Sequence, residues 1–161
     1  MFSKTVTHFI AATALCLAAG AAQAQVPQYG GNVNHEQARK AVAAALAEAR
    51  KMGIPMAVAV VDTAGMLVAF ERMDNTQTGS VNVAQDKAQS AAMFRRPTKV
   101  FQDLVAGGGV GLRILGLRGA NAVEGGVPIV VDGKILGAIG VSGGSAEQDG
   151  VVAKSGLDAL K

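Results

Sequence analysis

His35 is the residue of this chain best suited to bind a metal. The sequence has two histidines, His8 and His35, and one cysteine, Cys16, and of these only His35 lies beyond position 24. Imidazole is a frequent protein ligand of haem iron, whereas the common zinc sites need three or four histidine or cysteine ligands. His35 is therefore the candidate metal ligand of this sequence, with a solvated residue at a helix start as the alternative, and the common zinc sites are excluded.

Three basic residues, Lys87, Arg95 and Arg96, are candidates for binding a carboxylate. Guanidinium groups pair with carboxylates through parallel hydrogen bonds, so the arginines suit haem propionates or a small organic acid. Lys87 lies beside the apolar face of an expected helix, where an amine either pairs with a ligand or, with a lowered pKa, acts as a base. The alternatives are arginines that stabilise a helix C-terminus and a lysine whose stem packs on the core.

Motifs typical of common enzymes and of nucleic-acid-binding proteins do not occur in the sequence. The glycine run at 107–111 is not followed by the Lys-Ser/Thr of a phosphate-binding loop, and there is no Gly-x-Ser-x-Gly. The net charge is only +3, the basic residues are spread along the chain, and aromatic residues make up 4% of it. We therefore expect a small-molecule ligand and no nucleic-acid partner, and we assign no catalytic residue.

The first 24 residues are typical of a cleavable secretory signal peptide. Lys4 provides a short basic region, Phe9 to Ala19 is apolar, and Ala22-Gln23-Ala24 is a small-x-small cleavage triplet. The apolar stretch has about half of the roughly 20 residues that a membrane-spanning helix needs. We expect cleavage after Ala24, export to the periplasm or the medium, and no membrane anchor.

The rest of the chain alternates apolar runs with turn residues. Residues 25–33 contain Pro and Gly and are expected to form a flexible arm. Asn34 is placed to cap a helix whose apolar residues follow three-and-four spacing up to Gly53. The other expected elements are a hairpin of strands 56–62 and 66–72, helices 80–94 and 98–105, a strand at 112–117, a hairpin over 125–142 that turns at Asp132-Gly133, and a helix from Ser145 to about Leu160.

This order of elements, α-β-β-α-α-β-β-β-α, indicates an α+β fold. Two hairpins separated by helices favour a mostly antiparallel five-stranded sheet with helices on its faces over a doubly wound parallel sheet. The length of residues 34–161 is enough for one core and too short for two ordinary domains. We therefore expect a single domain.

Several short phrases occur in an order that resembles the GlcG/HbpS-like family. Relatives of that family include the C-terminal domain of PduO-type corrinoid adenosyltransferases. The resemblance implies a layered profilin-like fold, homo-oligomers in many members, and haem as one ligand of the family. The phrases are Val60-Val61-Asp62 with Gly65, Phe70 with Arg72-Met73-Asp74, Lys87-Ala88, Phe94-Arg95-Arg96-Pro97-Thr98, Gly125-Gly126-Val127-Pro128, Gly137-Ala138-Ile139-Gly140-Val141-Ser142-Gly143, and Gln148-Asp149.

Three functions remain open at this point. The first is an exported haem- or tetrapyrrole-binding protein, in which His35 ligates the iron and Lys87, Arg95 and Arg96 meet carboxylates. The second is an enzyme, or an enzyme accessory, that takes a small hydroxy or keto acid. The third is an oligomeric scaffold without chemistry. The ligand class of the first comes from the family resemblance, and the residues come from the sequence.

Overall fold

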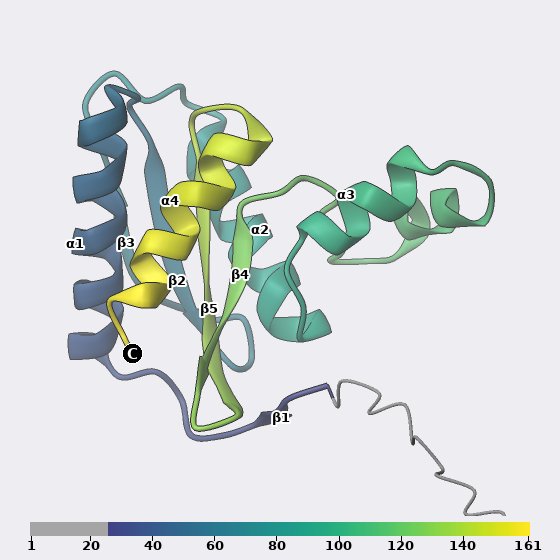
Figure 1. Cartoon of the computed structure of the whole chain (residues 1–161), viewed down its shortest axis with the longest axis horizontal. Coiled ribbons are helices and arrows are strands. Elements are labelled where there is room, and N and C mark those ends of the chain that lie inside the picture. The colour runs from purple at the N-terminus through teal and green to yellow at the C-terminus, as the bar shows by residue number, and fades with distance from the viewer. Residues whose placement is uncertain (1–25) are drawn as a thin grey trace, which may run out of the picture.

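The computed structural model describes residues 26–161, so the expected signal peptide lies outside the described residues. No helix in the described part is both long and apolar enough to cross a membrane. The elements, shown in Figure 1, are β1 (Gln28–Tyr29), α1 (His35–Met52), β2 (Ala57–Asp62), β3 (Leu67–Arg72), α2 (Ser80–Phe94), α3 (Lys99–Ala106), a 3₁₀-helix (Gly109–Gly116), β4 (Gly126–Val131), β5 (Lys134–Ser142) and α4 (Ala146–Asp158).

The strands form one sheet that is antiparallel except at one short strand. β5 pairs antiparallel with β4 on one side and with β2 on the other, and β2 pairs antiparallel with β3. β4 and β3 are therefore the two long edges of the sheet. β1 is parallel to the first residues of β5, with Gln28 opposite Lys134 and Tyr29 opposite Ile135. The predicted α+β class and the mostly antiparallel five-stranded sheet are confirmed.

Helices cover both faces of the sheet, with α1 and α4 on one face and α2 on the other (Figure 1). The alternation along β2 follows this division, because Val58 and Val60 face α1 and α4 whereas Ala59 faces α2. Small residues bring α2 close to the sheet: a Cβ at Gly140 would lie 2.1 Å from the carbonyl oxygen of Ala84. The two faces therefore have separate cores, which we call the α1/α4 core and the α2 core.

The ends of several elements match the sequence signals. Asn34 and Gln37 form a reciprocal capping box at the start of α1, with bonds of 2.9 and 3.0 Å. The β4–β5 hairpin turns at Asp132 and Gly133, which have φ angles of 49° and 73°. Two consecutive left-handed residues are the geometry for which the Asp-Gly pair is favoured in tight hairpins.

The strand expected at 112–117 is wrong: residues 112–116 belong to the 3₁₀-helix, and Leu117 is its C-cap. Its apolar residues are solvent-exposed, with Leu112 at 50% and Leu115 at 69%, and only Ile114 is buried. A strand in the sheet would have buried such a run. Instead, α3 and the 3₁₀-helix project from the body of the domain as one extension, residues 99–123, which we call the α3 extension (Figure 1).

The fifth strand is instead β1, within the segment expected to be a flexible arm. The hydroxyl of Tyr29 donates to the carbonyl oxygens of Ala92 at 2.9 Å and of Met93 at 3.1 Å. Val33 is buried in the α1/α4 core. The described part of this segment, residues 26–33, therefore contacts both faces of the domain. Tyr29 is hydrogen-bonded on the α2 side, and Val33 packs into the α1/α4 core.

Candidate functional site

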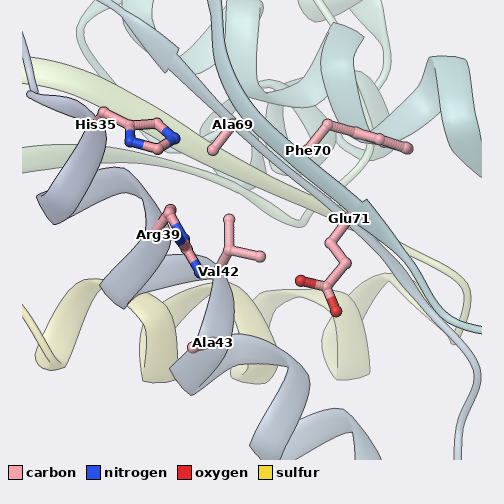
Figure 2. A pocket seen from close by; sticks show the side chains of 7 residues that line it. All are labelled: His35, Arg39, Val42, Ala43, Ala69, Phe70 and Glu71. Carbon is pink, nitrogen blue, oxygen red and sulfur yellow. The ribbon is translucent and has the colours of Figure 1, made fainter.

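A pocket of about 370 Å³ opens between the start of α1 and β3, at one long edge of the sheet (Figure 2). We call it the β3-edge pocket. Its α1 residues share one side of the helix because their spacing follows the helical repeat. The pocket is lined by His35, Arg39, Val42, Ala43, Ala69, Phe70 and Glu71.

His35 is the first residue of α1, as the sequence predicted, and it is exposed at this pocket. The capping box of Asn34 fixes the first turn of the helix and leaves the imidazole free. Arg39 follows one turn later and lines the same pocket. An imidazole that can ligate iron and a guanidinium that can bind a carboxylate therefore address one cavity.

The β3 wall of the pocket is polar at one end and has no aromatic surface. The Oε1 atom of Glu71 lies 4.0 Å from Nη2 of Arg50, and both side chains are exposed. The ring of Phe70 points away from the pocket in Figure 2 and packs against the α2 core. Apolar contact for a ligand therefore comes from Val42 and Ala69 rather than from stacked rings.

Lys87 is a buried residue whose side chain is only 1% exposed. Its Nζ atom lies 2.6 Å from Oδ2 of Asp149 and donates to the carbonyl oxygen of Val141 at 3.2 Å. The Oδ1 atom of Asp149 accepts a hydrogen bond from the backbone N–H of Gly144 at 2.9 Å. The amine is thus paired within the protein, and it connects α2 to the first turn of α4.

Burial raises the pKa of the Asp149 carboxyl above its ordinary value. Lys87 and the backbone N–H groups of Gly143 and Gly144 act in the opposite direction, but desolvation of the charged form is the largest effect. A carboxylate in such a place depends on its cation, and removing one partner of a buried pair leaves the other charge uncompensated. We interpret Lys87 and Asp149 as a structural ion pair.

Arg95 and Arg96 lie together at the end of α2, and each guanidinium rests near an aromatic ring. Arg95 is the left-handed C-cap of α2, and its guanidinium carbon lies 5.5 Å from the ring centre of Tyr29. The corresponding distance from Arg96 to the ring of Phe101 is 5.7 Å. Nε of Arg96 also donates to the carbonyl oxygen of Phe94 at 3.1 Å. These contacts are in the range of cation–π interactions.

The structure does not bring the four predicted ligand-binding residues together. His35 lies on α1, whereas Lys87 lies in α2 and the arginines follow its end, and these helices cover opposite faces of the sheet. Arg95 and Arg96 are neighbours, but the buried amine of Lys87 is turned toward Asp149. The predicted set therefore separates into a pocket residue, a buried ion pair and a surface arginine pair.

Sequence reasoning missed three residues that the structure places in or behind these sites. Arg39 could have been found, because it stands four residues after His35 and shares its side of the helix. Glu71 carries no such signal, since it lies on β3 and the other charged residues of the pocket lie on α1. Asp149 pairs with Lys87 across 62 positions of sequence, a distance that no local pattern spans.

Comparisons with known proteins agree on one family. The family model described as "Haem degrading protein HbpS-like" matches residues 33–158. Protein GlcG of Escherichia coli K12 is 38% identical over 110 residues, which cover 68% of this chain and 81% of GlcG.

Two solved structures share the fold. A double mutant of Streptomyces reticuli HbpS has a TM-score of 0.75 and 29% identity, and the match covers 88% of this chain and 95% of that chain. The PduOC:heme complex has a TM-score of 0.73 and 27% identity, and the match covers 81% of this chain and 96% of that chain. The chain belongs to the HbpS-like family.

Proposed function

We propose that this chain is an exported protein that binds haem or a related tetrapyrrole in the β3-edge pocket, with His35 as the ligand of the iron. The observation that carries the proposal is the position of His35, the only histidine between residues 26 and 161. It is exposed at a pocket whose next helical turn presents Arg39. The solved complex of PduOC with heme, which has the same fold, supports this ligand class.

The β3-edge pocket offers a haem one residue for its iron, one residue for a propionate, and room for part of the macrocycle. The imidazole of His35 suits the iron, and the guanidinium of Arg39 suits a propionate. A volume of about 370 Å³ is near the lower end for small-molecule sites, so the pocket receives part of the macrocycle and leaves the rest uncovered. Bound haem would supply a redox-active iron, while His35 and Arg39 hold and orient the ring.

A haemin titration of the purified protein, followed at the Soret band, tests the ligand. We expect a saturable shift near one haem per chain, weakened about tenfold or more in His35→Gly. Free imidazole should restore the spectrum of His35→Gly, because it can occupy the place of the missing ring. A shift that this variant leaves unchanged would move the iron ligand elsewhere, and the absence of a saturable shift would refute haem binding.

The propionate contact has its own test. Arg39→Gln should weaken the binding of haemin but not that of haemin dimethyl ester, which carries no carboxylate for the guanidinium to pair with. Lys51→Gln is a control that also removes one positive charge, because Lys51 is exposed and lies outside the pocket. An equal loss with both ligands would contradict the role of Arg39.

We also propose that the chain forms homo-oligomers through the α3 extension. Between residues 104 and 117 the only charged residue is Arg113, and contiguous apolar patches of this kind usually mark an interface. A second copy presents the same patch, so a two-fold arrangement would bury both. The exposed apolar residues are Val100, Leu104, Val110, Leu112, Leu115, Leu117 and Val123.

Sedimentation velocity tests the assembly. Val110→Glu/Leu115→Glu, at positions that are 73% and 69% exposed, should dissociate the oligomer, whereas Val151→Glu, at an exposed position of α4, should not. A monomeric wild-type protein would refute the proposal. An oligomer without any haem shift would favour the scaffold alternative.

The alternative of a small-acid-binding enzyme or accessory loses one member of its predicted clamp. The amine of Lys87 is paired with Asp149 and is not directed at a ligand with Arg95 and Arg96. The arginine pair remains able to bind an anion at the end of α2.

Export remains a proposal that rests on the sequence of residues 1–24. N-terminal sequencing of protein recovered from the periplasm and from the medium should give Gln25 as the first residue. Protein found only in the cytoplasm with Met1 intact would contradict both the export and the cleavage site.

A further inference from the structure

Residues from four of the phrases that carry the family resemblance converge at the other long edge of the sheet. They are Lys87, the Pro97-Thr98 pair, the Gly125-Gly126 pair and Asp149. None of them lines the β3-edge pocket. The haem proposal therefore leaves this convergence without a function.

Hydrogen bonds hold the start of α3 against β4 at this place. The backbone N–H of Thr98 donates to the carbonyl oxygen of Gly126 at 3.0 Å, and the backbone N–H of Gly126 donates to Oγ1 of Thr98 at 3.0 Å. Thr98 is fully buried. Directly behind Gly125 lies the ion pair, since a Cβ at Gly125 would be 2.9 Å from Nζ of Lys87. The backbone here is rigidly supported from two helices.

A pocket of about 300 Å³ lies in front of this backbone, and we call it the β4-edge pocket. Gly125, Gly126 and Gly150 line it without side chains, so backbone forms part of its wall. A side chain at Gly150 would meet Glu124, with the Cβ 2.5 Å from its Oε1 atom. The apolar surface of the walls is supplied by Pro97, Val127 and Leu157.

Two amines reach the same pocket from different helices, Lys99 at the start of α3 and Lys154 on α4. Each amine has an exposed carboxylate partner on its own helix, Asp103 for Lys99 and Asp158 for Lys154, and Nζ of Lys99 also lies 3.9 Å from Oε2 of Glu124. Exposed pairs one helical turn apart contribute little to stability, so each lysine can exchange its partner for a ligand at small cost. Glu124, the acidic residue of the lining, is mostly covered, with 19% of its side chain exposed.

We propose that the β4-edge pocket binds a small monocarboxylic acid with a short apolar chain. The chain lies against Val127 and Leu157, and the carboxylate is bound by the amines of Lys99 and Lys154. A cationic ligand is disfavoured because two amines and only one carboxylate line the cavity. Dicarboxylic acids are disfavoured because the inner walls are apolar or glycine backbone. The site is independent of the haem pocket, which lies at the opposite edge of the sheet.

The test is a titration of the purified ¹⁵N-labelled protein with hexanoate, observed by NMR at the amides of Gly125, Gly126 and Gly150. We expect saturable shifts of these three resonances, with hexylamine and hexanedioate giving none at the same concentration. Lys99→Gln/Lys154→Gln should weaken hexanoate binding about tenfold or more, because two charge-assisted hydrogen bonds are removed. Lys40→Gln/Lys51→Gln is the matched control, since both lysines are exposed residues of α1 and the net charge changes equally.

The outcomes separate this site from the haem proposal. Shifts at the three glycines that survive in the His35→Gly variant and disappear in the double lysine variant support an independent acid site. Binding that is equal in both double variants, or equal for hexylamine, would overturn the assignment of the amines. The absence of a saturable shift with hexanoate would overturn the acid site. It would not affect the haem proposal, which the haemin titration tests separately.

Discussion

The two long edges of the sheet carry pockets of similar size that are built in opposite ways. At the β3 edge, about 370 Å³ is bordered by the charged or ionisable side chains of His35, Arg39 and Glu71 on exposed surfaces. At the β4 edge, about 300 Å³ is bordered by the backbone of Gly125 and Gly126 and by apolar side chains, in front of the buried Lys87–Asp149 pair. The ionisable side chains of the first pocket are exposed, so we expect their removal to change the stability of the fold little. The wall of the second pocket includes Gly126, whose backbone is hydrogen-bonded to the buried Thr98 and so also contributes to the fold.

The largest effect should follow from Lys87→Met, which removes the amine behind the β4 edge. The carboxylate of Asp149 would remain buried without its cation, and we expect a loss of about 3–5 kcal/mol in the free energy of unfolding, measured with urea. Lys51→Met is the control, because its pair with Glu48 is exposed and should contribute less than about 1 kcal/mol. Restoration in the Lys87→Met/Asp149→Asn double variant would show that the unpaired charge is the cause. A loss no larger than the control would contradict a structural ion pair.

The pH dependence of this loss is a separate prediction. Burial raises the folded-state pKa of Asp149 above its unfolded value near 3.9, and removing Lys87 removes the main attraction that opposes the rise. The folded state then binds the proton more tightly, so stability is greatest below the unfolded pKa and falls as the pH rises through the folded pKa. The deficit of Lys87→Met should therefore be small near pH 4 and grow toward pH 7 in urea denaturation curves. A deficit that does not change with pH would contradict this account.

A methyl group at the β4 edge should give the next largest effect. In Gly126→Ala the new Cβ would lie 2.2 Å from the carbonyl oxygen of Lys87 and 2.7 Å from Cγ2 of Thr98, so backbone must move. We expect a loss of about 3 kcal/mol by thermal or chemical denaturation. Gly79→Ala serves as the control, because nothing lies within 4 Å of its Cβ and its φ of −60° suits any residue. Equal stability of the two variants would show that the β4 edge is less tightly packed than its geometry indicates.

The comparison also explains how much of the molecule the sequence could predict. The helix that starts at Asn34 and the turn at Asp132-Gly133 follow from local chemistry, and the structure confirms both. The strand expected at 112–117 is wrong because a short apolar run was taken as a buried strand, whereas its leucines are exposed on an extension. Single-chain patterns cannot distinguish a core from an exposed apolar surface.

The same reasoning applies to the candidate site. His35 was predicted at the start of a helix and is found there, because the capping signal at Asn34 is local to the sequence. The pairing of Lys87 with Asp149 needed the fold, because the two residues lie 62 positions apart in the sequence. The β4-edge pocket also needed the fold, because its lining residues come from the region of α3, from β4 and from α4, which lie far apart in the sequence.

A moderate effect should follow from Tyr29→Phe, which tests the short strand on the α2 side. The variant keeps the ring beside Arg95 but loses the hydroxyl that donates to the carbonyl oxygens of Ala92 and Met93. We expect a loss of about 1 kcal/mol in the free energy of unfolding and faster amide hydrogen exchange at Gly30 and Val33. Unchanged exchange at these two residues would mean that β1 is held by its backbone pairing with β5 alone.

The smallest effect on stability is expected at the β3 edge, from His35→Gly and Arg39→Gln. Both side chains are exposed, and neither forms a hydrogen bond or an ion pair with another described residue. Each variant should change the free energy of unfolding by about 0.5 kcal/mol or less, because both positions are exposed and the cost of glycine applies to the interior of a helix, whereas His35 is the first residue of α1. If these variants lose haemin affinity while remaining folded, the loss reports on the ligand contact itself. No such separation is possible for Lys87 at the β4 edge, because removal of its buried amine is expected to destabilise the fold itself.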